Sequence, residues 1–332
     1  MDMPPKGVTV IGAANMDING FSRDPLNMAD SNPGRVEYCP GGVGRNIAEN
    51  LLRLGAKVRL ISVIGDDPGG QLIRSSSGVM GLDIEHSLFI PGLSSSVYMA
   101  ILDSNGEMKL ALSDMSALER MTEGHLESKA DIIAGSGVVV LDTGLQAGMI
   151  RFILDRFGSS REPGPLFFLD PVSARKSAKV KGLTGRFHTL KLSRMEAAYL
   201  SGVAIPPPED EGLYPALKQS LEDAASFFMG EGSSRVFITL GKGGIFFASG
   251  EKRFFTPVHY VKPVNTSGGG DSFMAGMIYG TLRGWEPEKI AAFSAAMGAI
   301  TVRSGTTVSG EMSLSLVEET VKAFGKENRS NR

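Results

Sequence analysis

An aspartate that follows three consecutive glycines is the first feature of this 332-residue sequence whose residue types could do chemistry. It is Asp271, in the stretch TSGGGDSF of residues 266–273. Apolar residues after it recur at helical spacing, so the glycines are expected just before a helix N-terminus, where backbone N–H groups can bind a phosphate. Asp271 could then accept the proton of a hydroxyl group that attacks phosphorus. The stretch therefore favours phosphoryl transfer, and an ordinary Asp cap after a flexible turn is the alternative. The proposed anion hole consists of the backbone amides of Gly268, Gly269 and Gly270.

Three further turn-like stretches carry residues that suit a ligand. Residues 12–17, GAANMD, place Asn15 and Asp17 after a strand, where their side chains could hold vicinal sugar hydroxyls. Residues 41–46, GGVGRN, let the backbone approach a ligand. Residues 239–244, TLGKGG, could bind a nucleotide phosphate or ribose, or could only form a hairpin. Each stretch alone could be an ordinary turn.

The elements that must position these residues are short apolar strands between helices. The apolar runs are VTVIGAA (8–14), VRLISVIG (58–65), VVVLD (138–142), LFFLD (166–170) and RVFITLG (235–241). Because these runs do not alternate with polar residues, they predict strands that are buried on both faces of a parallel sheet. Helical spacing over residues 45–54, 271–283 and 286–303 predicts helices that cover the sheet. Residues 18–39 are too long for a plain connection and predict a lid with strands of its own.

Composition excludes several classes of partner and site. The net charge of -2 and the lack of a Lys/Arg run make a nucleic-acid partner unlikely. The single cysteine, Cys39, cannot form an internal disulfide, and the four histidines lie too far apart for a zinc cluster. The N-terminus lacks a signal-peptide pattern and no apolar run approaches a membrane span, so no membrane partner and a cytoplasmic location are expected.

In this order and spacing, the stretches resemble the ribokinase-like (PfkB) family of sugar and nucleoside kinases over essentially the full length. The motifs that carry the resemblance are GGVGRN, DPVS (170–173), KLSRME (191–196), TLGKGG and TSGGGDSF. Residues 12–51 and 188–202 are similar to a nucleoside kinase of this family beyond these shared motifs.

The resemblance implies a ribokinase-like three-layer α/β fold in which a central, mostly parallel sheet is flanked by helices and carries a small β lid. Residues 1–17 and 40–328 would form the kinase domain, and residues 18–39 the lid, with a further lid part near 93–114. The resemblance also implies ATP and Mg²⁺ as cofactors, with K⁺ as a further candidate. The partner would be a small sugar or nucleoside phosphorylated on its primary hydroxyl, and two copies would pair through the lid into a homodimer.

Carried over residue by residue, the resemblance makes Asp271 the base and gives amides of the anion hole to Gly268 and Gly270. The middle glycine, Gly269, stands where the family often has Ala, which keeps the amide. The residues that match the sugar-binding positions are Asp17, Gly42 and Asn46. The residues that match the nucleotide side are Thr239, Gly241 and Gly244.

The sequence departs from the family pattern in the motif expected to contact the metal ion and the phosphates. The family's Asn-x-x-Glu appears with Ser193 in place of Asn, and Glu196 would still organise Mg²⁺ through water. Asp170 is a second candidate for the magnesium environment, or it only caps a strand end. Lys191 would contact an ATP phosphate, or it is only a solvated charge.

Two pairs of loop residues complete the predicted site. Asn265 and Ser267 could line a site for a monovalent cation beside the anion hole. Ser31 and Asn32, in the turn before Pro33, have acceptors that could read the base of a nucleoside, or they only form the turn.

Three other functions compete with this reading. A kinase of the same fold could act on ribose, a hexose phosphate or a purine nucleoside instead. A dinucleotide-binding oxidoreductase would need a G-x-G-x-x-G turn after the first strand, and the sequence has none there. A non-catalytic binding protein on this fold would be expected to lose its base, whereas Asp271 is present.

Overall fold

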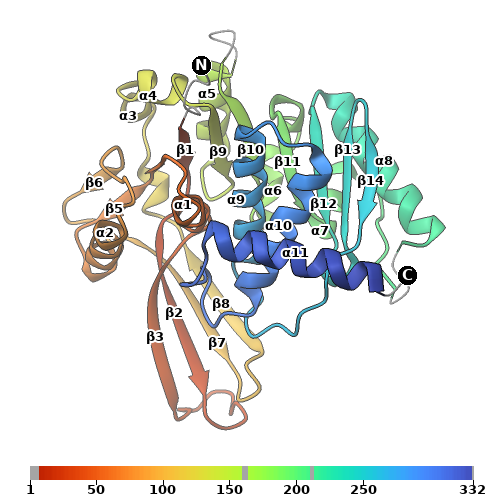
Figure 1. Ribbon diagram of the computed structural model, residues 1–332. Helices are drawn as coiled ribbons and strands as arrows, with labels where there is room; N and C mark the ends of the chain where they lie inside the picture. Colours follow the sequence, from red (N-terminus) through yellow and green to blue (C-terminus); the bar gives the residue numbers. More distant parts are fainter. Residues whose placement is uncertain (1–6, 159–163, 210–212, 331–332) are drawn as a thin grey trace.

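Each of the five apolar runs of the sequence contributes a strand to one eight-stranded sheet (Figure 1). The computed structural model describes residues 7–158, 164–209 and 213–330, so residues 1–6 of the predicted kinase domain lie outside the described residues. The strands of this main sheet are β1 (Val8–Ile11), β4 (Val58–Ile61), β9 (Val138–Asp142), β10 (Leu166–Asp170), β11 (Thr189–Ser193), β12 (Arg235–Thr239), β13 (Ile245–Ser249) and β14 (Arg253–Thr256). Their order is β14-β13-β12-β11-β10-β9-β1-β4; β13 pairs antiparallel with both β12 and β14, and the other pairs are parallel. The mostly parallel sheet is therefore confirmed.

Two of the predicted strands match their runs completely. Strands β9 and β10 cover residues 138–142 and 166–170. Alternate residues of β9 enter two separate cores, for example Val139 on one side of the sheet and Val140 on the other. A strand that packs on both faces has no polar face, which explains the continuous apolar run.

In the other three runs, the strand of the main sheet stops before the run does. The run 58–65 divides at Ser62, whose N–H donates to Ser87 Oγ at 3.0 Å. After this break, β5 (Val63–Gly65) pairs with β6 (Leu88–Ile90) in a separate two-stranded sheet. The run 8–14 ends with β1 because the Ala13 N–H donates to a side chain, Asp142 Oδ2, instead of to a strand. The run 235–241 ends with β12 because the chain turns there into β13.

Helices cover both faces of the main sheet and complete the predicted three layers. The described helices are α1 (Val43–Arg53), α2 (Pro68–Met80), α3 (Glu123–Glu127), α4 (Ala130–Ala134), α5 (Ala147–Phe157), α6 (Ala174–Ser177), α7 (Arg194–Ser201), α8 (Pro215–Glu231), α9 (Gly269–Leu282), α10 (Pro287–Val302) and α11 (Leu314–Ser330), with short 3₁₀ turns at Leu118–Arg120, Ala178–Val180, Thr184–Arg186 and Gly241–Gly243. Helices α5, α7 and α8 pack in one core, and α1, α9, α10 and α11 pack in the other. The three predicted helices correspond to α1, α9 and α10, each within two residues at either end. Among the described helices, none has the length and apolar content that crossing a membrane requires.

A second, smaller sheet projects from this body at the lower left of Figure 1. Its strands are β2 (Asn15–Ser22), β3 (Gly34–Gly41), β7 (Ser96–Leu102) and β8 (Met108–Asp114), in the order β3-β2-β7-β8. We call it the small sheet. Both segments assigned to a lid from the sequence, 18–39 and 93–114, contribute strands to it. Its first two strands extend beyond 18–39 at both ends, so Asn15 and Asp17 belong to β2 itself.

The carboxyl ends of the parallel strands meet at one edge of the main sheet. Strands β9, β10, β11 and β12 end there at Asp142, Asp170, Ser193 and Thr239. Open α/β sheets bind their ligands at this edge, because the loops that follow the strands converge there. The predicted site residues are therefore brought to one side of the molecule by the topology of the sheet.

Candidate active site

The glycine run forms the beginning of helix α9. Gly268 is the N-cap with a φ of 79°, a left-handed conformation that favours glycine. A Cβ atom at this position would also collide with the carbonyl oxygen of Thr307. Gly269 and Gly270 follow in the first turn, whose N–H groups have no acceptor within the helix. The glycine run therefore marks a helix N-terminus as predicted, although the helix begins within the run, at Gly269, and its first amides can face an anion.

Asp271 lies in the same first turn and is 8% exposed. Its Oδ2 accepts a hydrogen bond of 2.9 Å from Asn46 Nδ2 on α1, which joins the two glycine-rich motifs of the sequence. Burial and the nearby charge of Asp170 raise the pKa of Asp271 to about 7, against the opposing influence of Lys191 and of the Asn46 hydrogen bond. A carboxylate with this pKa can accept a proton near neutral pH, as a general base must.

Lys191 and Asp170 form a buried ion pair beside the anion hole. Lys191 Nζ lies 2.8 Å from Asp170 Oδ2, and both side chains are almost fully buried. A Cβ atom on Gly270 would lie 2.9 Å from the same Nζ, so the ammonium group reaches the first turn of α9. The alternative of a solvated lysine is therefore wrong. Lys191 is therefore a fixed positive charge beside the first turn of α9.

Asp170 is less suited to a metal than predicted. Its Oδ2 contacts Lys191, and its Oδ1 accepts a hydrogen bond of 2.9 Å from the Val172 N–H. Both oxygens thus have partners within the protein, as the strand-end alternative expected.

Glu196 belongs to a helix cap. The Ser193 N–H donates to Glu196 Oε2 at 2.7 Å, and Ser193 Oγ accepts from the Glu196 N–H at 3.4 Å. This capping box begins α7 and explains how Ser193 can replace the asparagine of the family motif. Within the described ranges, no group of three or more acidic, histidine or cysteine side chains forms a cage for a metal ion. The site fits Mg²⁺ only if a bound nucleotide and water supply most of the ligands.

The sugar-binding candidates gather where β2 and β3 meet α1. Asn15 Nδ2 donates to Asp17 Oδ1 at 2.6 Å, and burial raises the pKa of Asp17 to about 6 against the effect of this hydrogen bond. A Cβ atom on Gly41 would collide with the Asp17 carboxylate, and Gly42 has a φ of 99°. Asn46 Oδ1 is buried and has no partner among the described residues, so it can accept a hydrogen bond from a substrate hydroxyl.

Ser31 and Asn32 lie at the opposite end of the small sheet. Asp17 pairs with Cys39 near the base of the β2–β3 hairpin, and five further residues of β2, about 17 Å of strand, separate Asp17 from the turn. Asn32 Oδ1 accepts from the Asn27 N–H at 2.7 Å. Both residues thus belong to the turn at this distance from Asp17, and that they read the base of a nucleoside stays a prediction.

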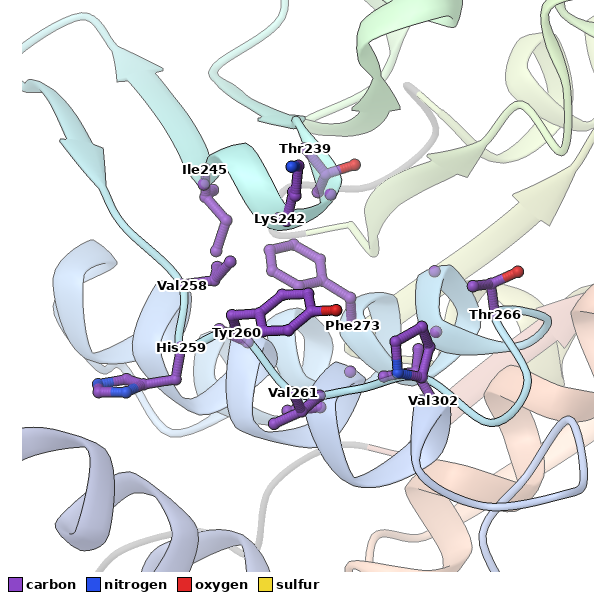
Figure 2. Close-up of a pocket in the computed structure, with 18 residues that line it drawn as sticks. Thr239, Lys242, Ile245, Val258, His259, Tyr260, Val261, Thr266, Phe273 and Val302 are labelled. Carbon is purple, nitrogen blue, oxygen red and sulfur yellow. The ribbon is translucent and has the colours of Figure 1, made fainter. Parts of the chain in front are cut away.

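A cavity of about 330 Å³ lies on the other side of the glycine run (Figure 2). All three residues predicted for the nucleotide side, Thr239, Gly241 and Gly244, line this cavity. Gly269 and Gly270 of the predicted anion hole line it as well. A largely apolar wall contributed by α10 and by residues 258–263 suits a planar base. In Figure 2 the ring of Tyr260 extends across the front of this cavity, and that of Phe273 lies behind it.

The predicted residues Asn265 and Ser267 lie in the loop between this wall and Gly268. Asn265 Oδ1 accepts from the Ser267 N–H at 2.9 Å, and Asn265 Nδ2 donates to the Gly305 carbonyl at 3.4 Å. The two residues thus lie beside the anion hole, where residues 303–308 come close to it.

Two parts of the site were not found from the sequence. Residues 258–263 line the cavity, but VHYVKP contains no recognisable motif. Asp142, fully buried, accepts hydrogen bonds of 2.7 Å from the N–H groups of Ala13 and Gly144 and thereby holds the turn between β1 and β2. Its charge also raises the pKa of Asp271. The only sequence signal was an acid at the end of an apolar run, which we interpreted as part of the strand.

Comparison with known proteins agrees with this geometry. The pfkB family of carbohydrate kinases matches residues 5–313. The chain is 36% identical to the pseudouridine kinase of Escherichia coli (strain K12) over 81% of this chain and 82% of that protein. A putative sugar kinase from Clostridium perfringens superposes with a TM-score of 0.82 at 34% identity and covers 96% of both chains. A ribokinase from Arabidopsis thaliana, solved with ribose and ATP, has the same fold, with a TM-score of 0.77 at 18% identity over 96% of this chain and 99% of that one. The chain therefore belongs to the PfkB family of carbohydrate kinases.

Proposed function

We propose that this kinase transfers the γ-phosphoryl group of ATP to the 5′-hydroxyl of pseudouridine. The observation that carries the proposal is the Asn46–Asp271 hydrogen bond, because it joins a carboxylate with a pKa near 7, beside the glycine run, to a residue proposed to bind the sugar. The choice of pseudouridine is supported by the 36% identity to the Escherichia coli enzyme.

The residues divide the reaction among them. Asp17 and Asn15 hold the ribose hydroxyls, and Asp271 takes the proton from the 5′-hydroxyl as its oxygen forms a bond to the γ-phosphorus. The bond from that phosphorus to the β-phosphate oxygen breaks, and ADP leaves. The amides of Gly268, Gly269 and Gly270, together with Lys191, stabilise the negative charge of the group in transfer.

The cavity lined by Thr239, Gly241 and Gly244 would hold the adenine and ribose of ATP. Mg²⁺, when bound, neutralises charge on the phosphates, and Glu196 is placed to orient its water ligands. We propose a monovalent cation such as K⁺ at the loop of Asn265 and Ser267.

The small sheet would act as the lid, and its apolar face would pair with a second copy. Strand registers align Tyr38, Ile18, Met99 and Leu112 in one row across the four strands. Tyr38 is 62% exposed and Leu112 is 64% exposed. Because side chains alternate along a strand, the neighbouring row with Asp17 faces the other way, toward the sugar-binding residues. An uncovered row of large apolar side chains indicates an interface.

A comparison of substrates tests the proposed function. The purified protein is incubated with Mg-ATP and with pseudouridine, uridine, adenosine or free ribose, and kcat/KM is measured for each. We expect pseudouridine to exceed uridine by about ten-fold or more, because a site that offers an acceptor to the second ring N–H of pseudouridine would leave that acceptor unpaired with uridine; Ser31 and Asn32 are the candidates for it. Equal use of uridine would refute the specific substrate, and preference for ribose would indicate a ribokinase.

A further inference from the structure

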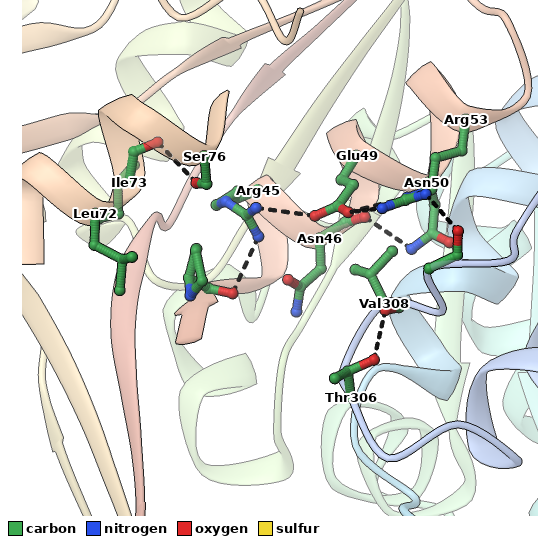
Figure 3. Close-up of polar contacts among 12 residues, drawn as sticks. Arg45, Asn46, Glu49, Asn50, Arg53, Leu72, Ile73, Ser76, Thr306 and Val308 are labelled. Atoms are coloured by element: carbon green, nitrogen blue, oxygen red, sulfur yellow. Dashed lines mark hydrogen bonds and ion pairs between the residues drawn. The ribbon is translucent and has the colours of Figure 1, made fainter. Parts of the chain in front are cut away.

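A buried chain of ion pairs runs along helix α1 beside the active site (Figure 3). Its members are Arg45, Glu49 and Arg53, which are four residues apart and therefore lie on one stripe of the helix. Arg45 Nη2 lies 2.9 Å from Glu49 Oε2. Arg53 donates from both Nε and Nη2 to Glu49 Oε1, at 3.0 and 2.8 Å. One carboxylate thus holds two guanidinium groups in fixed orientations.

One end of this chain holds the sugar side of the site. Arg45 Nη1 donates to the Pro40 carbonyl at 3.1 Å, just before β3 ends. The next residue, Gly41, lies so close to Asp17 that a side chain there would collide with the carboxylate. The position of Arg45 therefore fixes the end of β3 against Asp17.

The other end of the chain holds the phosphate side. Arg53 Nη1 donates to the Gly310 carbonyl at 2.9 Å. Gly310 belongs to the segment 303–313, in which the Thr307 carbonyl packs on Gly268. A shift of this segment would therefore move the N-cap of α9 and the amides of the anion hole.

The Arg45–Glu49 end of the chain is buried, and the Arg53 end is partly exposed. Arg45 and Glu49 are 2% and 5% exposed, and Arg45 Nε has no partner among the described residues. Loss of the Glu49 carboxylate would leave the Arg45 guanidinium without a counterion in a poorly solvated interior, whereas Arg53 can be removed with the Arg45–Glu49 pair intact.

We propose that Glu49 is a positioning residue that couples the sugar side of the site to the anion hole through Arg45 and Arg53. Binding of a nucleotide at the glycine run then orders the end of β3 around Asp17, and binding of a nucleoside orders the anion hole. This inference rests on the proposed function, which assigns the sugar to the Asp17 side and the phosphates to the glycine run. It does not depend on which nucleoside the enzyme uses.

The first test measures the coupling directly. The dissociation constant of pseudouridine is determined by calorimetry without and with saturating Mg-AMP-PNP, in the wild type and in Arg53→Met, which leaves the Arg45–Glu49 pair intact. We expect the analogue to tighten pseudouridine binding by about five-fold or more in the wild type, the usual lower range for coupled sites, and by less than about two-fold in the variant. Lys218→Met is the matched control, because Lys218 also pairs with a glutamate four residues away, on the distant helix α8.

Unchanged coupling in Arg53→Met would overturn the inference, since a purely structural contact does not alter a ratio of two affinities. Glu49→Gln should remove the coupling as well, and it should also lower the thermal stability because it leaves Arg45 unpaired.

The second test needs no nucleoside and so separates this inference from the proposed substrate. Hydrogen exchange of the amides of residues 34–42 is followed in the wild type, Arg53→Met and Lys218→Met, without and with Mg-AMP-PNP. We expect the analogue to slow exchange in the wild type and the control but not in Arg53→Met. Equal slowing in all three would refute the coupling, whereas failure of the wild type to bind pseudouridine would refute only the proposed substrate.

Discussion

Asp271 has neighbours that shift its pKa in opposite directions. Its burial and the charges of Asp170 and Asp142 raise the pKa, and Lys191 and Asn46 lower it, with a result of about 7. A carboxylate in water would be a much weaker base, with a pKa near 4. The surroundings therefore suit this residue to the proposed role of a base at neutral pH, and the charge of Lys191 offsets part of the negative charge of the acids.

Substitution of Asp271 by Asn should stop catalysis without loss of nucleotide binding. The amide has the shape of the carboxylate but cannot accept the proton, and a general base typically contributes about 10² to 10⁴ in rate. We expect kcat to fall by that factor and the dissociation constant of Mg-AMP-PNP to change by less than about three-fold. A variant that keeps more than about a tenth of the wild-type kcat would remove Asp271 from the role of base.

The dependence of kcat/KM on pH should show the pKa of Asp271. Because the base must be ionised, activity should rise with pH, with an apparent pKa near 7 in the free enzyme. Lys191 stabilises the ionised form, so Lys191→Met should shift this acidic limb upward by about one unit. Lys218→Met, far from the site, should leave the limb in place. A limb that stays at the same pH in Lys191→Met would show that another group is titrating.

At the scale of elements, strand β8 carries the sharpest test of the proposed dimer. Leu112 lies in the exposed apolar row of the small sheet, and Ser113 points to the opposite face of the same strand. Leu112→Glu places a charge in both halves of a symmetric interface, and each copy also loses about 1.5 to 3 kcal/mol of apolar burial. We expect dimers in the wild type and in Ser113→Glu, and monomers in Leu112→Glu, by sedimentation velocity at micromolar concentration. A monomeric wild type would refute pairing through this face.

The sequence predicted elements and residues well where the signal is local. The runs of β9 and β10 are apolar because both faces of these strands are buried. The glycines before Asp271 predict a helix N-terminus from local sequence alone. The division of 58–65 at Ser62 could not be foreseen, because it depends on Ser87, which is 25 residues away. The pairing of Lys191 with Asp170 and the role of Asp142 likewise depend on contacts between different strands. The distance of Ser31 and Asn32 from Asp17, about 17 Å of strand, could not be foreseen, because a motif gives no direction in space.

For the whole molecule, the buried acids of the site predict how stability depends on pH. The folded-state pKa values of Asp17, Asp142 and Asp271 are raised to about 6, 6 and 7, so the folded protein binds protons that the unfolded chain does not. Their contribution to stability is therefore lost as pH rises through these values. His188, whose pKa burial lowers to about 4, acts in the opposite direction below its ordinary value of 6.5.

Three raised acids outweigh one lowered histidine between pH 8 and pH 5.5. We expect the free energy of unfolding of the ligand-free protein to increase by about 2 kcal/mol over this range, with a Tm higher by a few degrees at pH 5.5. Asp271→Asn, which removes the largest of the three shifts, should lose most of this increase. A Tm that is lower at pH 5.5 than at pH 8 would contradict the prediction.

The small sheet is assembled from two parts of the chain that are made at different times. Its central strands, β2 and β7, pair in parallel from Asn15↔Ser96 to Phe21↔Leu102, so β2 must wait for a partner about 80 residues away. A ribosome adds about 5 to 20 residues per second, so the β2–β3 hairpin spends several seconds without β7. During that time Tyr38 and the other apolar residues of the hairpin are open to chaperones and to neighbouring nascent chains. The face that we propose to pair with a second copy is thus also a surface through which the growing chain can aggregate.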